Sequence, residues 1–429
     1  MINKNFIALF SLFVGTALTA VASILTTIVI ARNTTTEIFG NYSAILATIT
    51  TFAPLCGFGI AQYWLKLFGQ HSSYGSLWID NSLKFIAIST SLVFTSLIVW
   101  FYFTTETQYL FIVSALLSLI VFKSVSSEII SSILQIDSKY IFLSIWQFLQ
   151  ASLMLFIVIG LVYIFSISLD ELKIVSIQLF TVFIFFIFSV YIFTKFIKKQ
   201  KSLVYIEKVQ EIKKKYNASI YNIFKESAPF GISGLFYLIY YQLGVVFVRH
   251  LEGAEASAYY TVAFTFLSAA LLVPSVIYQK FLLPKLHRWA YHDKEKFEKS
   301  YYYGNYIMLF LGIFGFLFLW FFSPYFVNLF FGEKYQDSIY LVQLMAINIP
   351  IVYVASSAGS LLVTQEYMKI KVYYMGISAL LSLILSVPMI KTYGIEGAIY
   401  TNIICNSFIL CIYFYKVKKD ILTKKVLDN

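Results

Sequence analysis

The chain is poor in charged residues, in cysteine and in histidine. Only 12% of its 429 residues are charged, whereas soluble domains carry about 25%. Its three cysteines, Cys56, Cys405 and Cys411, lie inside apolar stretches at spacings that match no metal or redox motif. The four histidines show no metal-ligand spacing either. These shortages argue against a soluble fold and against a metal site.

Catalytic motifs are missing as well. The sequence has no glycine-rich phosphate loop, no HExxH and no Ser/His/Asp set. We therefore expect neither an enzyme nor a bound cofactor. Because no ATP motif is present, two energy sources remain. One is coupling to an H+ or Na+ gradient, and the other is consumption of the product by downstream assembly. The net charge of +11 comes from lysines at the ends of apolar segments, so we expect no nucleic-acid partner.

Apolar sequence makes up most of the chain, which is 59% hydrophobic. About 20 apolar residues cross the hydrocarbon of a bilayer as a helix, and a lone segment in lipid must be helical to satisfy its own backbone. The first run has features of a signal peptide, but it continues to Ala31 and is long enough to span. We predict an all-α integral membrane protein with twelve spans at residues 6–30, 43–68, 83–103, 109–135, 140–165, 172–197, 223–248, 258–283, 303–325, 339–363, 371–391 and 397–417.

One long polar interval, between Lys195 and Lys225, holds nine lysines and separates six spans from six. It predicts an N-terminal six-helix lobe at 1–197, a basic cytoplasmic linker at 198–222 and a C-terminal six-helix lobe at 223–429. The linker is either an amphipathic helix on an anionic membrane surface or a solvated connection.

The basic residues also predict the orientation. Positive charge gathers on the cytoplasmic side of membrane proteins. With a cytoplasmic N-terminus, all but five of the 32 lysines and arginines fall on that side, the exceptions being Arg32, Lys173, Arg249, Lys334 and Lys391. We therefore predict that both termini are cytoplasmic.

The two halves carry matching residues. Arg32 and Tyr42 stand ten residues apart, as do Arg249 and Tyr259, at an offset of about half the chain. Further matches are Glu37 with Glu255, Pro54 with Pro274, and Lys66 with Lys280. The pattern predicts two repeats of the same orientation, related by an axis along the membrane normal. Pro54, Pro274 and Pro350 lie inside spans and predict kinks there.

Three turns carry a family resemblance. Residues 31–42 end one span with Arg32 and begin the next with Gly40-Asn-Tyr42; residues 328–335 contain a glycine-tyrosine turn, and residues 391–398 contain Gly-x-x-Gly-Ala. These motifs resemble those of bacterial O-antigen and capsule oligosaccharide flippases of the Wzx type. That family belongs to a superfamily that also contains the multidrug/toxic-compound exporters.

The resemblance implies a V-shaped bundle of two six-helix lobes like those exporters. It implies a flippase that moves an undecaprenyl-pyrophosphate-linked oligosaccharide, such as an O-antigen unit for lipopolysaccharide biosynthesis, to the outer leaflet of the bacterial inner membrane by alternating access. The lipid bilayer, a polysaccharide polymerase and a chain-length regulator are the partners it implies. Family members often carry an aspartate midway along helix seven, where this chain reads Tyr240-Tyr-Gln-Leu-Gly244.

Two charged residues lie inside the fourth predicted span. Counting from Tyr109, Lys123 lies roughly 21 Å into a core of about 30 Å, and Glu128 roughly 28 Å. Lys123 is either a phosphate ligand, a snorkelling residue or part of a structural ion pair. Glu128 is either a proton- or sodium-coupling carboxylate or an interfacial residue. The two point about 140° apart on one helix and cannot pair directly.

Four further cations lie at span ends. Lys66 and Lys280 are expected near the inner surface, either as anchors or as a rim that attracts pyrophosphate. Arg32 and Arg249 are expected at the outer ends, where they either help release pyrophosphate or cap helix C-termini.

Polar and aromatic side chains inside the later spans predict a sugar path. They are Tyr237, Tyr241 and Gln242 in span seven, and Gln343, Asn348, Asn402 and Asn406 in spans ten and twelve. Hydrogen bonding between helices is the alternative for all of them.

Two other functions compete with the flippase. An ion-coupled small-molecule or drug antiporter of the same superfamily would be expected to bury acidic residues, whereas here a lysine lies deeper than any carboxylate. A membrane enzyme of polysaccharide assembly would need a sizeable outer loop or an acidic catalytic pair.

Overall fold

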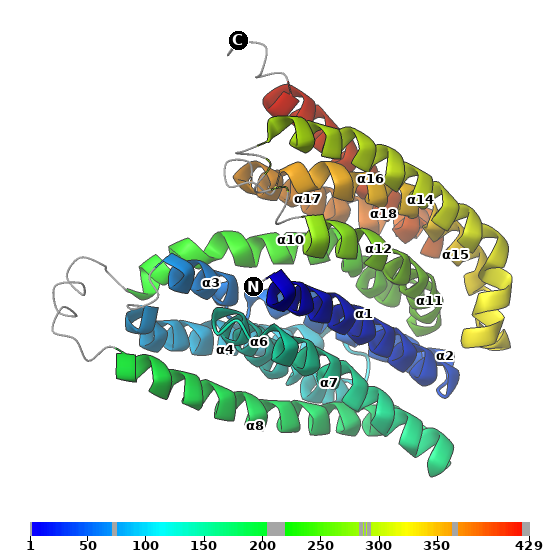
Figure 1. The fold of residues 1–429 in the computed structure, drawn as a ribbon. Coiled ribbons are helices and arrows are strands. Elements are labelled where there is room, and N and C mark those ends of the chain that lie inside the picture. The colour runs from blue at the N-terminus through cyan, green and yellow to red at the C-terminus, as the bar shows by residue number, and fades with distance from the viewer. Residues whose placement is uncertain are drawn as a thin grey trace. The chain divides into compact units, whose positions relative to one another are not determined.

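The computed structural model describes residues 2–70, 75–203, 219–282, 293–362 and 368–422, with Leu286 and Trp289 between them. Within these ranges the chain is helical and has no β-strand (Figure 1). Twelve helical stretches there are long and apolar enough to cross a membrane. The chain is therefore a multi-pass α-helical membrane protein, as its composition predicts.

The helices group into two compact units. Unit 1 holds Met1–Ala22 and Ile45–Leu238, and unit 2 holds Ser23–Ala44 and Ile239–Asn429. The tip of the first hairpin thus belongs to unit 2, and the beginning of the seventh span belongs to unit 1. Residues 204–218, most of the predicted linker, lie outside the described residues, so the predicted division at 198–222 stays a prediction.

Unit 1 contains the first six spans. They are formed by α1 (Ile2–Arg32), α2 (Thr36–Phe52), α3 (Ile60–Gln70), α4 (Ile79–Thr104), α5 (Gln108–Leu117), α6 (Ile120–Ile136), α7 (Tyr140–Ile159) and α8 (Glu171–Leu203), the tip of the α1–α2 hairpin excepted. α6 packs against α3, α7 and α8. α6 is therefore the central helix of this unit.

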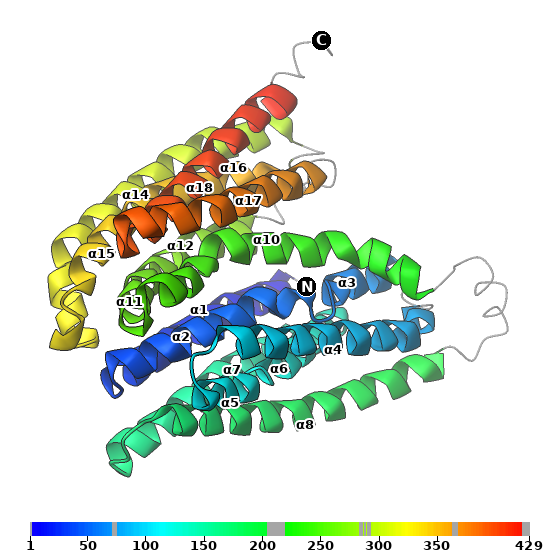
Figure 2. The same ribbon diagram turned by 180° about the vertical axis from the view of Figure 1, so that it is seen from behind.

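Unit 2 contains most of the last six spans. They are formed by α10 (Ile220–Glu252), α11 (Ala254–Ala270), α12 (Leu272–Pro274), α14 (Lys294–Phe330), α15 (Ser338–Ala346), α16 (Asn348–Leu361), α17 (Met368–Tyr393) and α18 (Ile395–Lys416). α16 packs between α14 and α18, and α17 packs along α18 (Figure 2). Several helices are longer than predicted, because hydropathy marks only the apolar part of a helix: α14 begins nine residues before the predicted span at 303–325.

Four spans are interrupted. Three of the interruptions lie near the prolines at which kinks are predicted: the second span breaks after Pro54, the eighth changes to a wider helical turn after Pro274, and the tenth breaks at Ile347, three residues before Pro350. The kinks themselves stay a prediction. The fourth break, at Ser118–Leu119, contains no proline and was not predicted. Proline alone does not decide the matter, since three other prolines lie inside unbroken helices: Pro229, Pro324 and Pro388.

The break in the second span explains why the beginning of α10 belongs to unit 1. Gly57, Phe58 and Gly59 all have positive φ, at 79°, 47° and 81°, a conformation that favours glycine. A Cβ at Gly59 would lie only 2.6 Å from the backbone nitrogen of Gly231 in α10. The broken span and α10 therefore touch backbone to backbone, which only glycine permits at these positions.

Candidate functional site

Lys123 lies in unit 1 on α6, shortly after the break in the fourth span. Two serines lie at the break: Ser114 and Ser118 each donate a hydrogen bond back to the carbonyl four residues earlier, at 2.7 and 2.8 Å. Such bonds bend helices. The backbone then tightens, with the amide of Val121 donating to the carbonyl of Ser118.

Neutral groups surround Lys123 in the described part of the chain. Its Nζ donates to Oγ1 of Thr181 at 3.4 Å and lies 5.4 Å from the centre of the Phe185 ring, and both residues are on α8. In the described part of the chain no carboxylate lies within 4.0 Å of it. The structural ion pair that the sequence left open is therefore not found there. A cation in a span without a counter-ion costs several kcal/mol, at about 2.5–3.5 on insertion scales.

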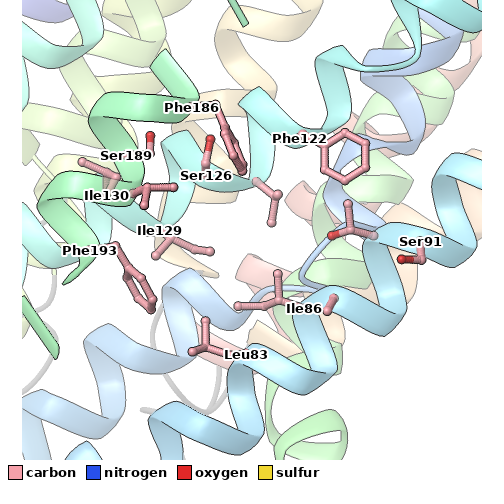
Figure 3. Close-up of a pocket in the computed structure, with 14 residues that line it drawn as sticks. Leu83, Ile86, Ser91, Phe122, Ser126, Ile129, Ile130, Phe186, Ser189 and Phe193 are labelled. Carbon is pink, nitrogen blue, oxygen red and sulfur yellow. The ribbon is translucent and has the colours of Figure 1, made fainter. Parts of the chain in front are cut away.

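A cavity of about 340 Å³ lies on the neighbouring face of α6, enclosed by α4, α6 and α8 (Figure 3). Its walls are apolar, with Phe122, Ile129 and Phe186 among them, and hydroxyl groups are its polar lining. One of these, Oγ1 of Thr90, is buried and has no hydrogen-bond partner among the described residues. Phe122 lines the cavity while the adjacent Lys123 turns about 100° away from it. The cation and the apolar cavity therefore occupy adjacent faces of one helix.

Glu128 is exposed on α6. It has no hydrogen bond or ion pair within the described residues. Its predicted role in ion coupling stays a prediction.

Lys66 has a partner that the sequence did not suggest. Its Nζ lies 3.1 Å from Oε2 of Glu226 on α10, and both side chains are about half exposed, at 46% and 50%. Lys280 lies in the helical segment Ser275–Leu282, but its side chain is outside what the structure describes. The predicted cationic rim of Lys66 and Lys280 stays a prediction.

The two predicted arginines tie the tip of the first hairpin into unit 2. Arg32 donates from Nη1 to the carbonyl of Leu329 at 2.8 Å, next to the end of α14. Arg249 donates from Nε to Oδ1 of Asn41 at 2.6 Å. Arg32 thus caps a helix C-terminus, although that of α14 rather than its own. The two matched hairpins also touch each other, since Thr36 and Tyr259 both donate to the carboxylate of Glu255.

The glycine-tyrosine turn after α14 closes on the same hairpin. Lys334 donates to the carbonyls of Arg32 and Thr34, and Tyr335 donates to the carbonyl of Ala31 at 3.2 Å. Burial, together with the nearby charge of Arg32, lowers the pKa of Lys334. This turn motif therefore has a structural role, which is to hold the end of α1.

The predicted aromatic face of the seventh span divides between the units. Tyr237 belongs to the part in unit 1 and is 41% exposed. Tyr241 and Gln242 belong to unit 2, where the hydroxyl of Tyr241 hydrogen-bonds Oγ of Ser268 on α11 at 3.1 Å. Tyr241 therefore joins two helices.

The asparagines predicted for a sugar path bond to one another instead. Nδ2 of Asn406 donates to Oδ1 of Asn348 at 2.9 Å and to Oδ1 of Asn402 at 2.8 Å, and Asn402 donates to the carbonyl of Tyr240. All three asparagines are buried. Interhelical hydrogen bonding, the alternative for this group, is what the structure has. Gln343 likewise donates to the carbonyl of Trp320.

Lys371 was counted in the sequence only as a charge of the inner side. In unit 2 it projects from α17 toward α16 and α18: Nζ donates to the carbonyl of Gly359 at 3.2 Å and lies 5.8 Å from the centre of the Tyr413 ring. The spacing of Lys369 and Lys371 holds a signal for this, because two residues apart on a helix means about 200° apart. One of the two has to face the neighbouring helices.

Comparison with known proteins decides the family. The sequence profile of the family described as "Polysaccharide biosynthesis protein" matches residues 7–290, well over half of the chain. The chain belongs to this polysaccharide biosynthesis protein family. The sequence matches no curated protein.

Solved structures agree on the fold of this family member. A structure described as "protein A" has a TM-score of 0.69 at 13% identity, covering 96% of this chain and 94% of that one. The inward-facing and outward-facing conformations of a multidrug resistance MATE family transporter of the MOP superfamily each give 0.62 at 14% identity. They cover 95% and 97% of this chain, and 95% of that one. Family and fold together indicate a membrane exporter or flippase.

Proposed function

We propose that the chain is a flippase that moves an undecaprenyl-pyrophosphate-linked oligosaccharide from the inner to the outer leaflet of the bacterial inner membrane. One observation carries the proposal: a lysine without a carboxylate partner lies inside a span of a polysaccharide biosynthesis family member. Removing a pyrophosphate from water is heavily penalised unless a cation and donors receive it. The Lys123 ammonium supplies three donors and one positive charge.

The surroundings of Lys123 favour a transient anion over a permanent one. Thr181 offers a single neutral hydroxyl at 3.4 Å, the long end of hydrogen-bond distances, and Phe185 offers the face of a ring. Neither group neutralises the ammonium. No carboxylate among the described residues competes with an incoming phosphate oxygen for it. Lys123 therefore binds the anion during the crossing and releases it afterwards.

The remaining features of the proposal follow from the charge distribution and the resemblance. The excess of lysine on one side supports the proposal that both termini are cytoplasmic. A substrate of this class is used in O-antigen or capsule assembly. A polymerase and a chain-length regulator would then act on the flipped product. Proton or sodium coupling supplies the energy, with Glu128 as the coupling carboxylate.

A drug antiporter of the same superfamily is the second proposal, favoured by Glu128, which has no counter-ion among the described residues. One experiment separates the two. The gene is deleted in a host without paralogues, and surface polysaccharide and drug sensitivity are measured before and after complementation. The flippase predicts loss of surface polysaccharide with accumulation of lipid-linked repeat units. Intact polysaccharide together with increased drug sensitivity would support the antiporter.

A further inference from the structure

Unit 2 has a groove at the position where unit 1 has its apolar cavity. The third, fourth and sixth spans of each set of six enclose it: α4, α6 and α8 in unit 1, and α14, α16 and α18 in unit 2. The unit 2 groove is larger, about 960 Å³ against about 340 Å³. Its lining also differs in kind, since it includes four tyrosines, Asn305 and Lys418.

The unit 2 groove has a polar end and an apolar end. α14 and α18 run in opposite directions: α14 is antiparallel to α16, where Gly304 meets Ser357 and Gly312 meets Pro350, and α16 runs with α18. The ring of Tyr301, near the start of α14, lies 5.9 Å from that of Phe414, near the end of α18. Tyr302 and Lys418 therefore share one end, and Leu309 and Leu410 lie about 10–12 Å further along.

The polar end requires a ligand with two properties. Oδ1 of Asn305 is buried and has no hydrogen-bond partner among the described residues, so a ligand whose donor reaches this oxygen would satisfy it. Lys418 lines the groove, and Nζ of Lys419 lies 3.3 Å from the hydroxyl of Tyr415, which lines it too. These ammonium groups favour an anion. The apolar end favours a hydrocarbon chain.

We propose that this groove binds one anionic glycerophospholipid whose head group carries hydroxyl donors, phosphatidylglycerol being the simplest. The phosphate lies by Lys418 and the tyrosine hydroxyls, a head-group hydroxyl donates to Asn305, and an acyl chain lies along Leu309 and Leu410. Basic pockets between membrane helices bind anionic head groups in this way. Phosphatidylcholine lacks both the donor and the net charge, and phosphatidylethanolamine lacks the net charge.

The lipid comes from the leaflet that Lys418 faces, whichever side that is, and the site does not depend on the transported substrate. Three tyrosines on the groove wall are strongly exposed: Tyr302, Tyr306 and Tyr415. The cavity of unit 1 has only hydroxyl groups as its polar lining and no lysine. It therefore serves as the internal control.

The test uses the full-length protein in detergent and native mass spectrometry with added phosphatidylglycerol, phosphatidylethanolamine or phosphatidylcholine. We expect one phosphatidylglycerol to bind to the wild type in preference to the other two. Lys418→Gln should weaken that binding at least about tenfold, as expected for the loss of one hydrogen bond to a charged group. Asn305→Leu should weaken it about 2- to 12-fold, as expected for the loss of one hydrogen bond between neutral groups. Ser91→Ala, in the unit 1 cavity, should leave it unchanged.

The melting temperature of each variant without added lipid reports whether it is folded, so a weakened interaction cannot be mistaken for unfolding. Equal binding of phosphatidylglycerol and phosphatidylcholine would overturn the proposal. So would wild-type binding by both groove variants. Displacement of phosphatidylglycerol by an isoprenoid-pyrophosphate sugar would also overturn it, because the groove would then belong to the transported substrate.

Discussion

Two lysines, one in each unit, lie inside spans with no carboxylate beside them in the described part of the chain, yet their surroundings differ. Lys371 donates to the carbonyl of Gly359, in the last turn of α16, where the helix dipole leaves partial negative charge. Lys123 has only the hydroxyl of Thr181 and the ring of Phe185. Among the described residues, Lys371 thus lies at the negative end of a helix dipole, whereas Lys123 has one neutral hydroxyl and the face of one ring.

The charge of Lys371 is accounted for by the fold, since the side chain joins α17 to the end of α16 and lies over the Tyr413 ring. Lys123 has no such compensation among the described residues. The proposed function therefore assigns a structural role to Lys371 and an anion-binding role to Lys123. The three buried asparagines of unit 2 have a structural role like that of Lys371, because their amides form hydrogen bonds with one another.

The largest effect is expected at Lys123. Lys123→Ala should reduce polysaccharide export about 10- to 100-fold, since a hydrogen bond to a charged group contributes about 1.5–3 kcal/mol. Lys123→Arg keeps the charge and should retain part of the activity. Surface polysaccharide is measured in a deletion host, with the amount of membrane-inserted protein as the control. Normal export by Lys123→Ala would remove this residue from the path.

Lys371→Ala should give the opposite pattern. The change removes the donor to Gly359 and the ammonium over the Tyr413 ring. The free energy of unfolding should fall by up to about 1.7 kcal/mol, and the melting temperature in detergent should fall with it. Export per molecule of inserted protein should remain near that of the wild type. If export falls as far as in Lys123→Ala while stability is unchanged, the two lysines have the same role and the comparison fails.

Asn406→Leu should destabilise the protein to a smaller degree. The change leaves Oδ1 of Asn348 and of Asn402 without their donor. Interhelical hydrogen bonds in membranes contribute about 0.6 kcal/mol on average, so a loss of about 1 kcal/mol is expected for the two. A melting curve checks it. A specific loss of export at unchanged stability would indicate instead that these amides line the sugar path.

The smallest effect is expected at a carboxylate that forms ion pairs with two lysines. Asp137, between the fourth and fifth spans, accepts from Lys139 at 2.9 Å and Lys199 at 2.7 Å. Burial would raise the pKa of Asp137, but the hydrogen bonds from the two lysines outweigh it, and the pKa is lowered. The resulting stabilisation is present above the unfolded pKa of about 3.9 and is lost as the pH falls through the folded pKa.

Asp137→Asn should therefore lower the melting temperature at pH 7. The loss in free energy of unfolding should be no more than about 1 kcal/mol, because both lysines are half exposed. The difference from the wild type should shrink below about pH 4. A difference that is the same at both pH values would mean that the carboxylate charge plays no part.

The sequence predicts the spans because hydropathy reports directly on burial in lipid, and it predicts the depth of Lys123 because helical rise is regular. It does not predict Thr181 and Phe185 as neighbours, since that depends on how α6 packs against α8. Lys371 was missed for a related reason: a residue count assigns it to a membrane face, whereas its orientation around α17 turns it toward Gly359. The break at Ser118 was not predicted, because the span contains no proline there and the same serine or threonine spacing occurs at Thr261 and Thr265 inside the unbroken α11.

The proposed role of Lys123 is to receive the anion of a lipid-linked oligosaccharide during its crossing. The most direct test reconstitutes the purified protein in vesicles with a fluorescent undecaprenyl-pyrophosphate oligosaccharide. The fraction that becomes accessible to an external quencher is then followed over time. We expect rapid crossing with the wild type and with Lys371→Ala, and crossing close to that of protein-free vesicles with Lys123→Ala. Wild-type crossing no faster than in protein-free vesicles, or equal crossing with the wild type and Lys123→Ala, would contradict the claim.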